Sequence, residues 1–514
     1  MRLPAIPFGI LAYSIVSFAA KQEVLAEGSE VIQRCCEHAY RRFPSLVKFS
    51  AHETFQSPKY YSLQQVGMKP HCHFTPLNTQ HVSAIVSIAH DHACPFAVRS
   101  GGGMFWPGSS NIDKGLLIDL GHLRGIEVDH ERNVARLGPS LLWGEVYTTL
   151  SSLNLYVAGG RLPVVGVGGF LMHGGISFSS FEHGFASETV VNYEVVLADG
   201  SIVNANATSY PDLFWALKWG STNYGIVTRL DLSTYTLPPK FWAGMVVYHE
   251  LPDTVQKTLF DDWLKYIDKH SYDKKVFSMV SYEKGTKITG TILANLDGEP
   301  IPRFIPPEVA TPMIESTREL PFHEFVDSLM IVVGTEPKRV AWYPITTKPN
   351  ADMLLDFRKR AYEICGTLED HVKGFQCIIV IQPFTKGFIG ANPESAAYDV
   401  LHEPDDNLIL SLLELHWDSS EDDEEVNKAI ADIRAWTEST TKERGVYNAF
   451  IYPNYADGTH DFYGNSLSKR SLAKMLKVKQ KYDPEDVFGR LWKGGFKLPK
   501  SKVQHNTEHD RDEL

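Results

Sequence analysis

Three consecutive glycines follow a short apolar run and form the first group of residues suited to chemistry. Residues 98–103 read Val-Arg-Ser-Gly-Gly-Gly, so Gly101, Gly102 and Gly103 come directly after Arg99 and Ser100. Without Cβ atoms, successive backbone amides can surround an anion closely. A diphosphate fits such a loop, and a plain tight turn is the alternative. The run lacks the Gly-x-Gly-x-x-Gly spacing of a Rossmann dinucleotide site.

A second glycine-rich stretch spans residues 159–175. It reads GGRLPVVGVGGF and then continues to His173 and two further glycines. Glycine at this density costs backbone entropy and needs a reason, and close packing of the backbone against a large flat ligand is one. His173 either contacts that ligand or packs in the core. The predicted ligand contacts in this stretch are Gly160, Arg161, Gly166, Gly168, Gly169 and Gly174.

Two more motifs lie farther along the chain. Residues 212–228 read DLFWALKWGSTNYGIVT, and residues 452–457 read Tyr-Pro-Asn-Tyr-Ala-Asp. The second motif is followed by Tyr463-Gly464 and by KYDPEDVF at 481–488. Each motif is weak alone, but their fixed order is informative.

Taken in order, these motifs resemble fungal berberine-bridge-enzyme-like FAD oxidoreductases of the vanillyl-alcohol-oxidase type, over most of residues 70–498. The resemblance implies an α+β fold. A two-part PCMH-type FAD-binding domain would use residues 70–238 and return with 447–498, and residues 239–446 would form an inserted substrate domain of antiparallel sheet and helices. FAD would lie across the junction, with its diphosphate on the loop 100–103. Its ring would lie near 160–170 and near Gly225, Ile226, Val227 and Asn454.

The same resemblance implies an oxidoreductase that oxidises a small organic molecule, a secondary-metabolite intermediate, by hydride transfer to FAD with oxygen as acceptor. Family members often link FAD through a histidine directly after Arg-Ser-Gly-Gly, and many use a cysteine before the proline of the second stretch. This chain has Gly103 and Leu162 there, which predicts non-covalent FAD. Trp219 stands where a small residue is frequent, and either fills space or reshapes the pocket.

Two other functions stay open at this stage. Covalent linkage raises the oxidising power of the flavin in this family, so its absence leaves room for a cyclase in natural-product biosynthesis that uses FAD without net redox chemistry. A flavin-free scaffold protein is the third hypothesis. The intact glycine loops argue against it, because a protein without FAD would not need them.

An oxidation needs a group that accepts a proton as hydride leaves. Tyr452 is a candidate because it stands two residues before Asn454. Glu414 and His416 occupy alternating positions of an expected strand, so both can point into one cleft. His402 is a further candidate. The alternative for each of them is packing or surface exposure.

The remaining pattern supplies the elements that must position these groups. Within 76–235, strands are expected at 96–99, 115–120, 134–137 and 226–235, helices at 82–92, 142–150 and 212–218, and a hairpin at 193–203 closed by Asp199-Gly200. Between 241 and 449, longer strands are expected at 243–250, 287–295, 377–382 and 407–416. Helices at 253–270, 353–367 and 424–442 alternate with them and would cover an antiparallel sheet.

Composition and the chain ends indicate a compartment. A net charge of −12 argues against a nucleic-acid partner. Residues 1–20 have a basic start, an apolar stretch and small residues, which predicts a signal peptide, with no membrane span expected after its cleavage. The tail, 499–514, ends in Arg-Asp-Glu-Leu, close to an endoplasmic-reticulum retrieval signal. We therefore expect the endoplasmic reticulum lumen, with secretion as the alternative.

The six cysteines and one sequon fit the secretory pathway. A disulfide from Cys35 or Cys36 to Cys72 or Cys94 is expected, with the pairing open. None of the cysteines forms a Cys-x-x-Cys pattern, so no metal site is predicted. Asn206 begins Asn-Ala-Thr and is the expected glycosylation site.

Overall fold

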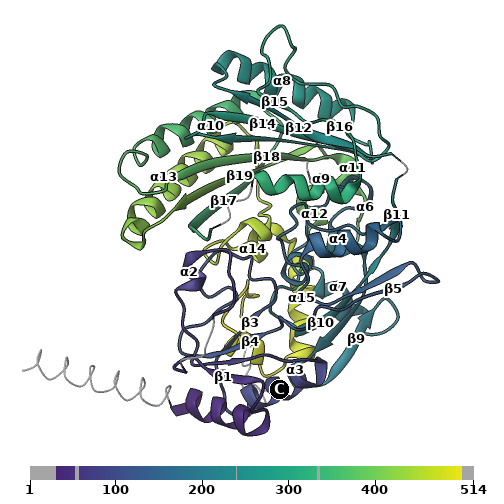
Figure 1. Ribbon diagram of the computed structural model, residues 1–514, viewed down its shortest axis with the longest axis vertical. Coiled ribbons are helices and arrows are strands. Elements are labelled where there is room, and N and C mark those ends of the chain that lie inside the picture. The colour runs from purple at the N-terminus through teal and green to yellow at the C-terminus, as the bar shows by residue number, and fades with distance from the viewer. Residues whose placement is uncertain (1–29, 53–56, 239, 333–335, 404, 501–514) are drawn as a thin grey trace, which may run out of the picture.

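The first part of the chain builds two sheets, which form the lower half of the molecule in Figure 1. The structure is a computed structural model that describes residues 30–52, 57–238, 240–332, 336–403 and 405–500. The expected signal peptide and the Arg-Asp-Glu-Leu tail lie outside these residues. A four-stranded sheet has the order β1-β2-β4-β3, with β2, β4 and β3 parallel. Its strands are β1 (Val47–Phe49), β2 (Cys72–Phe74), β3 (Phe96–Arg99) and β4 (Leu116–Asp119).

A five-stranded antiparallel sheet lies beside the first and has the order β5-β6-β10-β8-β9. The expected hairpin is confirmed as β8 and β9, and Gly200 takes a φ of 81° in its turn. Helix α3 (Thr79–Asp91) contacts this sheet through β8, β9 and β10. The strands are β5 (Ile126–Asp129), β6 (Val134–Leu137), β8 (Val190–Val196), β9 (Ile202–Asn206) and β10 (Ile226–Ser233). The short helices of this half are α2 (Leu63–Val66), α4 (Trp143–Ser151), α5 (Val167–Leu171), α6 (Ser180–His183) and α7 (Pro211–Leu217), and β7 (Leu155–Tyr156) pairs β11 (Tyr235–Thr236).

The middle of the chain forms a nine-stranded antiparallel sheet in the upper half of Figure 1. The order is β15-β12-β14-β13-β18-β19-β17-β20, with β16 also paired to β12. The long strands are β12 (Trp242–His249), β13 (Val276–Glu283), β14 (Ile288–Asn295), β17 (Arg339–Thr347), β18 (Gln376–Phe384) and β19 (Leu408–Trp417). The short ones are β15 (Ile314–Glu315), β16 (Arg318–Glu319) and β20 (Tyr447–Asn448).

Three amphipathic helices share one apolar core with this large sheet. Helices α8 (Asp253–Lys269), α10 (Ala351–Gly366) and α13 (Asp423–Glu443) lie along its outer face in Figure 1. Sheet residues at alternating positions therefore face the opposite way, toward the first half of the chain. Helices α9 (Phe322–Ser328), α11 (Lys386–Gly390) and α12 (Tyr398–His402) connect the strands.

The end of the chain returns to the first sheet. The backbone N–H of Phe96 in β3 donates to the carbonyl of Leu491 over 2.8 Å, and the N–H of Lys493 donates back to Phe96 over 2.9 Å. The ammonium of Lys497 donates to the Thr222 hydroxyl over 2.7 Å. Helices α14 (Phe462–Ser466), α15 (Lys469–Tyr482) and α16 (Val487–Arg490) precede this contact. The α+β class with an inserted antiparallel sheet is thus confirmed.

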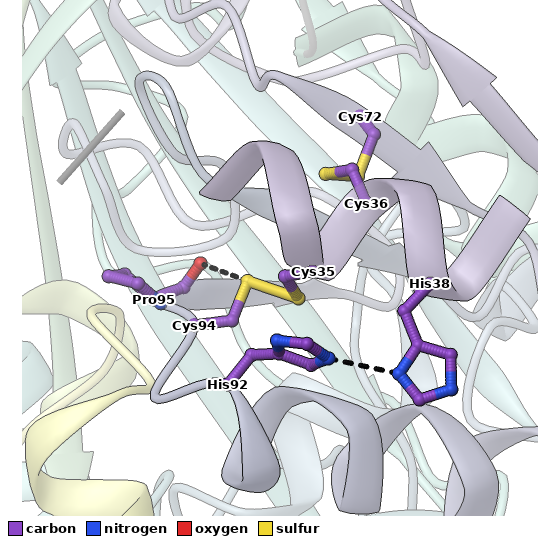
Figure 2. Close-up of a disulfide and its surroundings, with 7 residues drawn as sticks. All are labelled: Cys35, Cys36, His38, Cys72, His92, Cys94 and Pro95. Carbon is purple, nitrogen blue, oxygen red and sulfur yellow. Dashed lines mark hydrogen bonds between the residues drawn. A yellow bond between two sulfur atoms is a disulfide. The ribbon is translucent and has the colours of Figure 1, made fainter. Parts of the chain in front are cut away.

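Two disulfides fix the first described helix, over 30–42, to the four-stranded sheet region (Figure 2). Cys35 pairs with Cys94 and Cys36 pairs with Cys72, which settles the pairing that the sequence left open. A third disulfide, Cys365–Cys377, joins α10 to β18. In Figure 2 His38 on the same helix lies beside His92, with their ring nitrogens 2.9 Å apart.

Most expected elements are found with small shifts at their ends, but the sequence did not predict the long strands β13 and β17. The helix expected from residue 82 begins at Thr79, because the Asn78 side chain accepts the N–H of His81 and caps it. Strand β17 was missed because Pro344 interrupts it, and proline argues against a central strand. Its neighbour β20 pairs only with Thr346 and Thr347, so β17 behaves as an edge strand at Pro344.

Candidate active site

A cavity of about 2080 Å³ lies between the glycine-rich loops of the first half and the inner face of the nine-stranded sheet. Ordinary pockets for small molecules measure roughly 300–1,000 Å³. The cavity therefore has room for a dinucleotide-sized cofactor and a second molecule. Its walls combine residues 98–104, 160–173 and 221–227 with strands β13, β17, β18 and β19.

The glycine loop after β3 offers a row of free amides to this cavity. The backbone N–H groups of Gly101, Gly102, Gly103 and Met104 donate to no group among the described residues. Gly102 has a φ of 68°, which glycine adopts without strain. Successive unpaired amides form a nest for an anion, as a diphosphate requires.

The two glycine stretches touch backbone to backbone. A Cβ atom at Gly101 would lie 2.6 Å from the Cα of Gly166, and a Cβ atom at Gly166 would lie 2.7 Å from the Cα of Gly101. At Gly103, by contrast, an added Cβ would meet no atom within 4 Å. Glycine is needed at 101 and 166 to bring the loops together, whereas position 103 faces open space in the cavity wall.

Arg99 and Ser100 are predicted to bind the cofactor directly. In the structure their side chains bond to other parts of the protein and hold the loop in place. The Arg99 guanidinium forms an ion pair with Asp119 at 3.0 Å and donates twice to the Lys59 carbonyl. The Ser100 hydroxyl donates to the Pro139 carbonyl over 2.5 Å. Both residues line the cavity, but the bonds above tie their side chains to neighbouring backbone and to Asp119, while the loop amides stay unpaired.

The other predicted cofactor contacts divide into two groups. Those that line the cavity are Gly160, Arg161, Gly166, Gly168, Gly169, Gly225, Ile226, Val227 and Asn454. Gly174 does not belong to the lining: its φ is 80°, and a Cβ there would lie 2.5 Å from the Trp219 ring. Trp219 is fully buried behind the loop, stacked on Phe462, and does not reach the cavity either.

His173 contributes a buried neutral ring to the floor of the cavity. Its Nδ1 lies 2.7 Å from the Gly169 carbonyl, which can only accept, so Nδ1 carries the proton. The Ser221 hydroxyl donates to Nε2 over 2.9 Å and accepts the N–H of Phe496. Burial lowers the pKa of His173 from 6.5 to about 4, so the ring is neutral at ordinary pH. Asn454 secures the same loop by donating to the carbonyls of Phe170 and His173.

Glu414 and His416 stand together on β19 and face the cavity, as their alternation predicts. The Glu414 Oε2 and His416 Nε2 atoms are 3.3 Å apart, and both side chains are less than a fifth exposed. On β17, Trp342 lies opposite Glu414 in the sheet register and also lines the cavity. A carboxylate beside an imidazole can accept a proton and hold it between two groups.

Tyr452 lines the cavity but is poorly suited to accept a proton. Its ring is 2% exposed, and its hydroxyl accepts a hydrogen bond from the Asn454 amide over 3.1 Å. Burial is the main cause that raises the pKa of Tyr452 far above its usual value. The phenol therefore stays neutral and can donate a hydrogen bond, so Tyr452 is the weaker candidate for the proton acceptor. His402 lies on α12, outside the cavity lining, stacked on Tyr398.

Several cavity residues carried no recognisable sequence signal. Tyr61 lies on the wall near Glu414 and packs its ring on Trp342 at 5.7 Å. Burial, with Glu414 as a second cause, raises the pKa of Tyr61. Gln376, Ile378 and Val380 on β18 also line the cavity, and their alternating positions could have identified this part of its wall. Nothing in the short segment before α2 could have identified Tyr61.

The observed residues fit FAD. An anion nest, a backbone-lined wall and a cavity large enough for a dinucleotide meet in one place. The nest would hold the diphosphate, and the stretches at 160–170 and 225–227 would lie along the ring. Among the described residues, no cluster of three His, Cys, Asp or Glu side chains is arranged for a metal ion, and no helix combines the length and apolar character needed to cross a bilayer.

Comparisons with known proteins agree with this geometry. Residues 70–206 match the FAD binding domain family model. The chain is 31% identical over 480 residues to the FAD-dependent monooxygenase tpcD of Cochliobolus heterostrophus, covering 89% of this chain and 90% of the relative. It is 30% identical over 488 residues to the FAD-dependent monooxygenase sdcF of Emericella nidulans, covering 92% and 99%.

Solved structures share the fold at lower identity. The BBE-like 1 protein of Physcomitrella patens superposes with a TM-score of 0.75 at 16% identity, covering 91% of this chain and all of the other. The xylooligosaccharide oxidase of Myceliophthora thermophila gives 0.73 at 20%, covering 92% and 100%. Glucooligosaccharide oxidase of Acremonium strictum, which carries a 6-S-cysteinyl, 8α-N1-histidyl FAD, gives 0.70 at 20%, covering 91% and 98%.

The fold and the amide nest define an FAD-binding oxidoreductase with a PCMH-type cofactor domain. The chain belongs to the family of fungal FAD-dependent oxidoreductases to which it is about 30% identical, and it shares its fold with the BBE-like 1 protein. The relatives and neighbours above are named as monooxygenases or oxidases, or by family alone, so they do not favour the cyclase alternative.

Proposed function

We propose that this enzyme oxidises a small organic molecule, an intermediate of secondary metabolism, with molecular oxygen as the electron acceptor. The observation that carries the proposal is one cavity that joins the free amides after β3 to the carboxylate–imidazole pair on β19. The room beyond a dinucleotide would hold the substrate. The names of the fungal relatives support oxygen as the second substrate.

Bound FAD supplies the acceptor for the hydride. The protein supplies the proton acceptor and the orientation. Glu414 takes the proton that the substrate loses, and His416, 3.3 Å away, shares it and fixes the carboxylate. Tyr452 donates a hydrogen bond from the opposite loop, and Trp342 and the β18 side chains exclude water.

Product mass distinguishes the reaction classes. Purified holoenzyme is mixed without air with candidate phenols and benzylic alcohols, and the loss of yellow flavin colour is followed. A product lighter by two hydrogens, with an equal amount of hydrogen peroxide formed in air, supports the proposal. A product heavier by one oxygen atom would make the enzyme a monooxygenase instead, and an unchanged mass would make it a cyclase.

FAD is bound without a covalent link in this proposal. Gly103 and Leu162 both line the cavity, and neither side chain can form a bond to the flavin. Acid precipitation tests this point directly: all yellow colour should leave the polypeptide and stay in the supernatant. Colour that remains on the washed pellet would overturn it.

The proposed location is the endoplasmic reticulum lumen, with secretion as the alternative. Three disulfides support an oxidising compartment. Asn206 ends the edge strand β9, and its amide donates to Asn192 over 3.1 Å. We expect it to carry a glycan, so endoglycosidase treatment of the secretory-pathway protein should lower its mass. Retention inside cells that is lost when the last four residues are deleted would support the lumen.

A further inference from the structure

Arg161 reaches across the cavity from the second glycine stretch to the other half of the chain. Its Nη1 donates to the Gln382 amide oxygen over 2.5 Å, and its Nη2 donates to the Tyr455 hydroxyl over 2.7 Å. Nη1 also lies 3.5 Å from the Met279 sulfur, and the guanidinium stands 5.4 Å from the Phe277 ring centre. All four partners belong to the substrate sheet or to the segment after β20, and this places the guanidinium on the substrate side.

The charge of Arg161 has no counter-ion in the described part of the chain. No carboxylate there comes within 4 Å of the guanidinium, whereas the cavity cations Arg99, Arg124 and Lys338 each have one. Lys59 and Arg318 line the cavity without such a partner, but both are exposed to solvent. Arg161 alone among these cations is half-buried with neutral partners.

Part of the guanidinium remains available to a ligand. An arginine has five N–H groups. Hydrogen bonds to Gln382, Tyr455 and Met279 use three of them, which leaves two. The surrounding wall is apolar: Met279, Ile292, Phe178 and Val380 line it. A partly desolvated guanidinium with free donors in such a wall favours an anion that can accept two hydrogen bonds.

We propose that Arg161 binds an anionic group of the substrate, a carboxylate or an ionised phenol or enol, on an otherwise apolar molecule. Calling the bound anion a substrate rests on the proposed function, but the binding of an anion at Arg161 does not depend on the reaction. It moves Arg161 from the cofactor contacts, where the glycine stretch had placed it, to the residues that select the substrate. Gln382 and Tyr455 are positioning residues, because they hold the guanidinium against the wall.

Benzoate and benzamide test the inference, because they share shape and differ in charge. Each is titrated into the purified holoenzyme and followed by calorimetry. We expect wild-type protein to prefer benzoate, and the Arg161→Gln variant to bind benzoate roughly 10- to 150-fold more weakly with benzamide affinity unchanged. Arg161→Lys keeps a point charge without the fork and should fall between the two. The control is Arg318→Gln, which removes an exposed cavity charge and should leave benzoate affinity as it is.

Two results would overturn the inference. One is equal affinity of wild-type protein for benzoate and benzamide, or of wild type and Arg161→Gln for benzoate. The other is loss of FAD from Arg161→Gln, measured as flavin released by acid per polypeptide, since that would return Arg161 to the cofactor site. A failure to find any oxidised product would count against the proposed function only, because these titrations need no turnover.

Discussion

The contact between Gly101 and Gly166 predicts which glycines of the loop hold the cofactor. In Gly101→Ala the new Cβ would start 2.6 Å from the Gly166 Cα, and ordinary contact begins at 3.4 Å. The two backbones must therefore shift, by about 0.8 Å if ordinary contact is to be restored. Gly103→Ala is a matched control on the same loop, because its Cβ meets nothing within 4 Å. Neither glycine has a positive φ, so contact alone distinguishes the two changes.

Overpacking of this kind costs typically about 1–3 kcal/mol. If the loops separate in the free protein and must be forced together around the cofactor, FAD binding weakens by roughly 5- to 150-fold. Gly103→Ala keeps the backbone N–H and adds a methyl group that meets no protein atom within 4 Å, so we expect a change within about 0.5 kcal/mol, which is less than roughly threefold in affinity. The difference between the two variants is the quantity that the geometry fixes.

The assay is a titration of each apoprotein with FAD, followed by quenching of flavin fluorescence. Thermal melting without FAD reports whether the loop change also loosens the fold. Gly101→Ala binding FAD as tightly as Gly103→Ala would refute the reasoning, since it would show that the amide row does not depend on the close approach of Gly166 or does not hold the cofactor.

Three further predictions concern the same cavity. Gly103→His should keep part of the flavin on the polypeptide after acid precipitation, because position 103 has room for the ring that family members use; complete release, as expected of wild type, would contradict this. Glu414→Gln should slow anaerobic flavin reduction by roughly 100-fold or more, while Tyr452→Phe, which loses a neutral hydrogen-bond donor, should cost less than roughly tenfold; the reverse order would exchange their roles. Lowering the pH from 6.5 to about 4 should destabilise the fold through His173, because the unfolded chain takes a proton at 6.5 and the folded ring only near 4. The urea-unfolding free energy of His173→Asn should fall less over this range, and parallel pH profiles would contradict the prediction.

The sequence predicted the cofactor half well, because glycine marks close backbone approach by residue type alone. The loop at 101–103 and the stretch at 160–169 line the cavity as expected. Gly174 does not line the cavity, for a physical reason: glycine also makes room for a large core ring, here that of Trp219, and a glycine run does not tell on which side the ring or the ligand lies.

The substrate side of the cavity was harder to predict from the sequence, because its contacts join distant parts of the chain. Glu414 and His416 were found from alternation, which is a local signal. The partners of Arg161 lie 221 and 294 residues away, so no local pattern reveals that its side chain crosses the cavity. Tyr61 was not predicted either, because it contacts Trp342, which is distant in the sequence, and belongs to no motif.

The return of the chain end to β3 sets an order of events during synthesis. Trp492 lines the cavity and its backbone bridges to Phe96, and Lys497 ties Thr222 to the final segment. Because a chain emerges from the ribosome amino end first, the disulfides at Cys72 and Cys94 can close long before these residues appear. The cofactor cavity is then complete only after the residues up to Lys497 have left the ribosome, so stable FAD capture follows the synthesis of both halves and depends on flavin present where the chain folds.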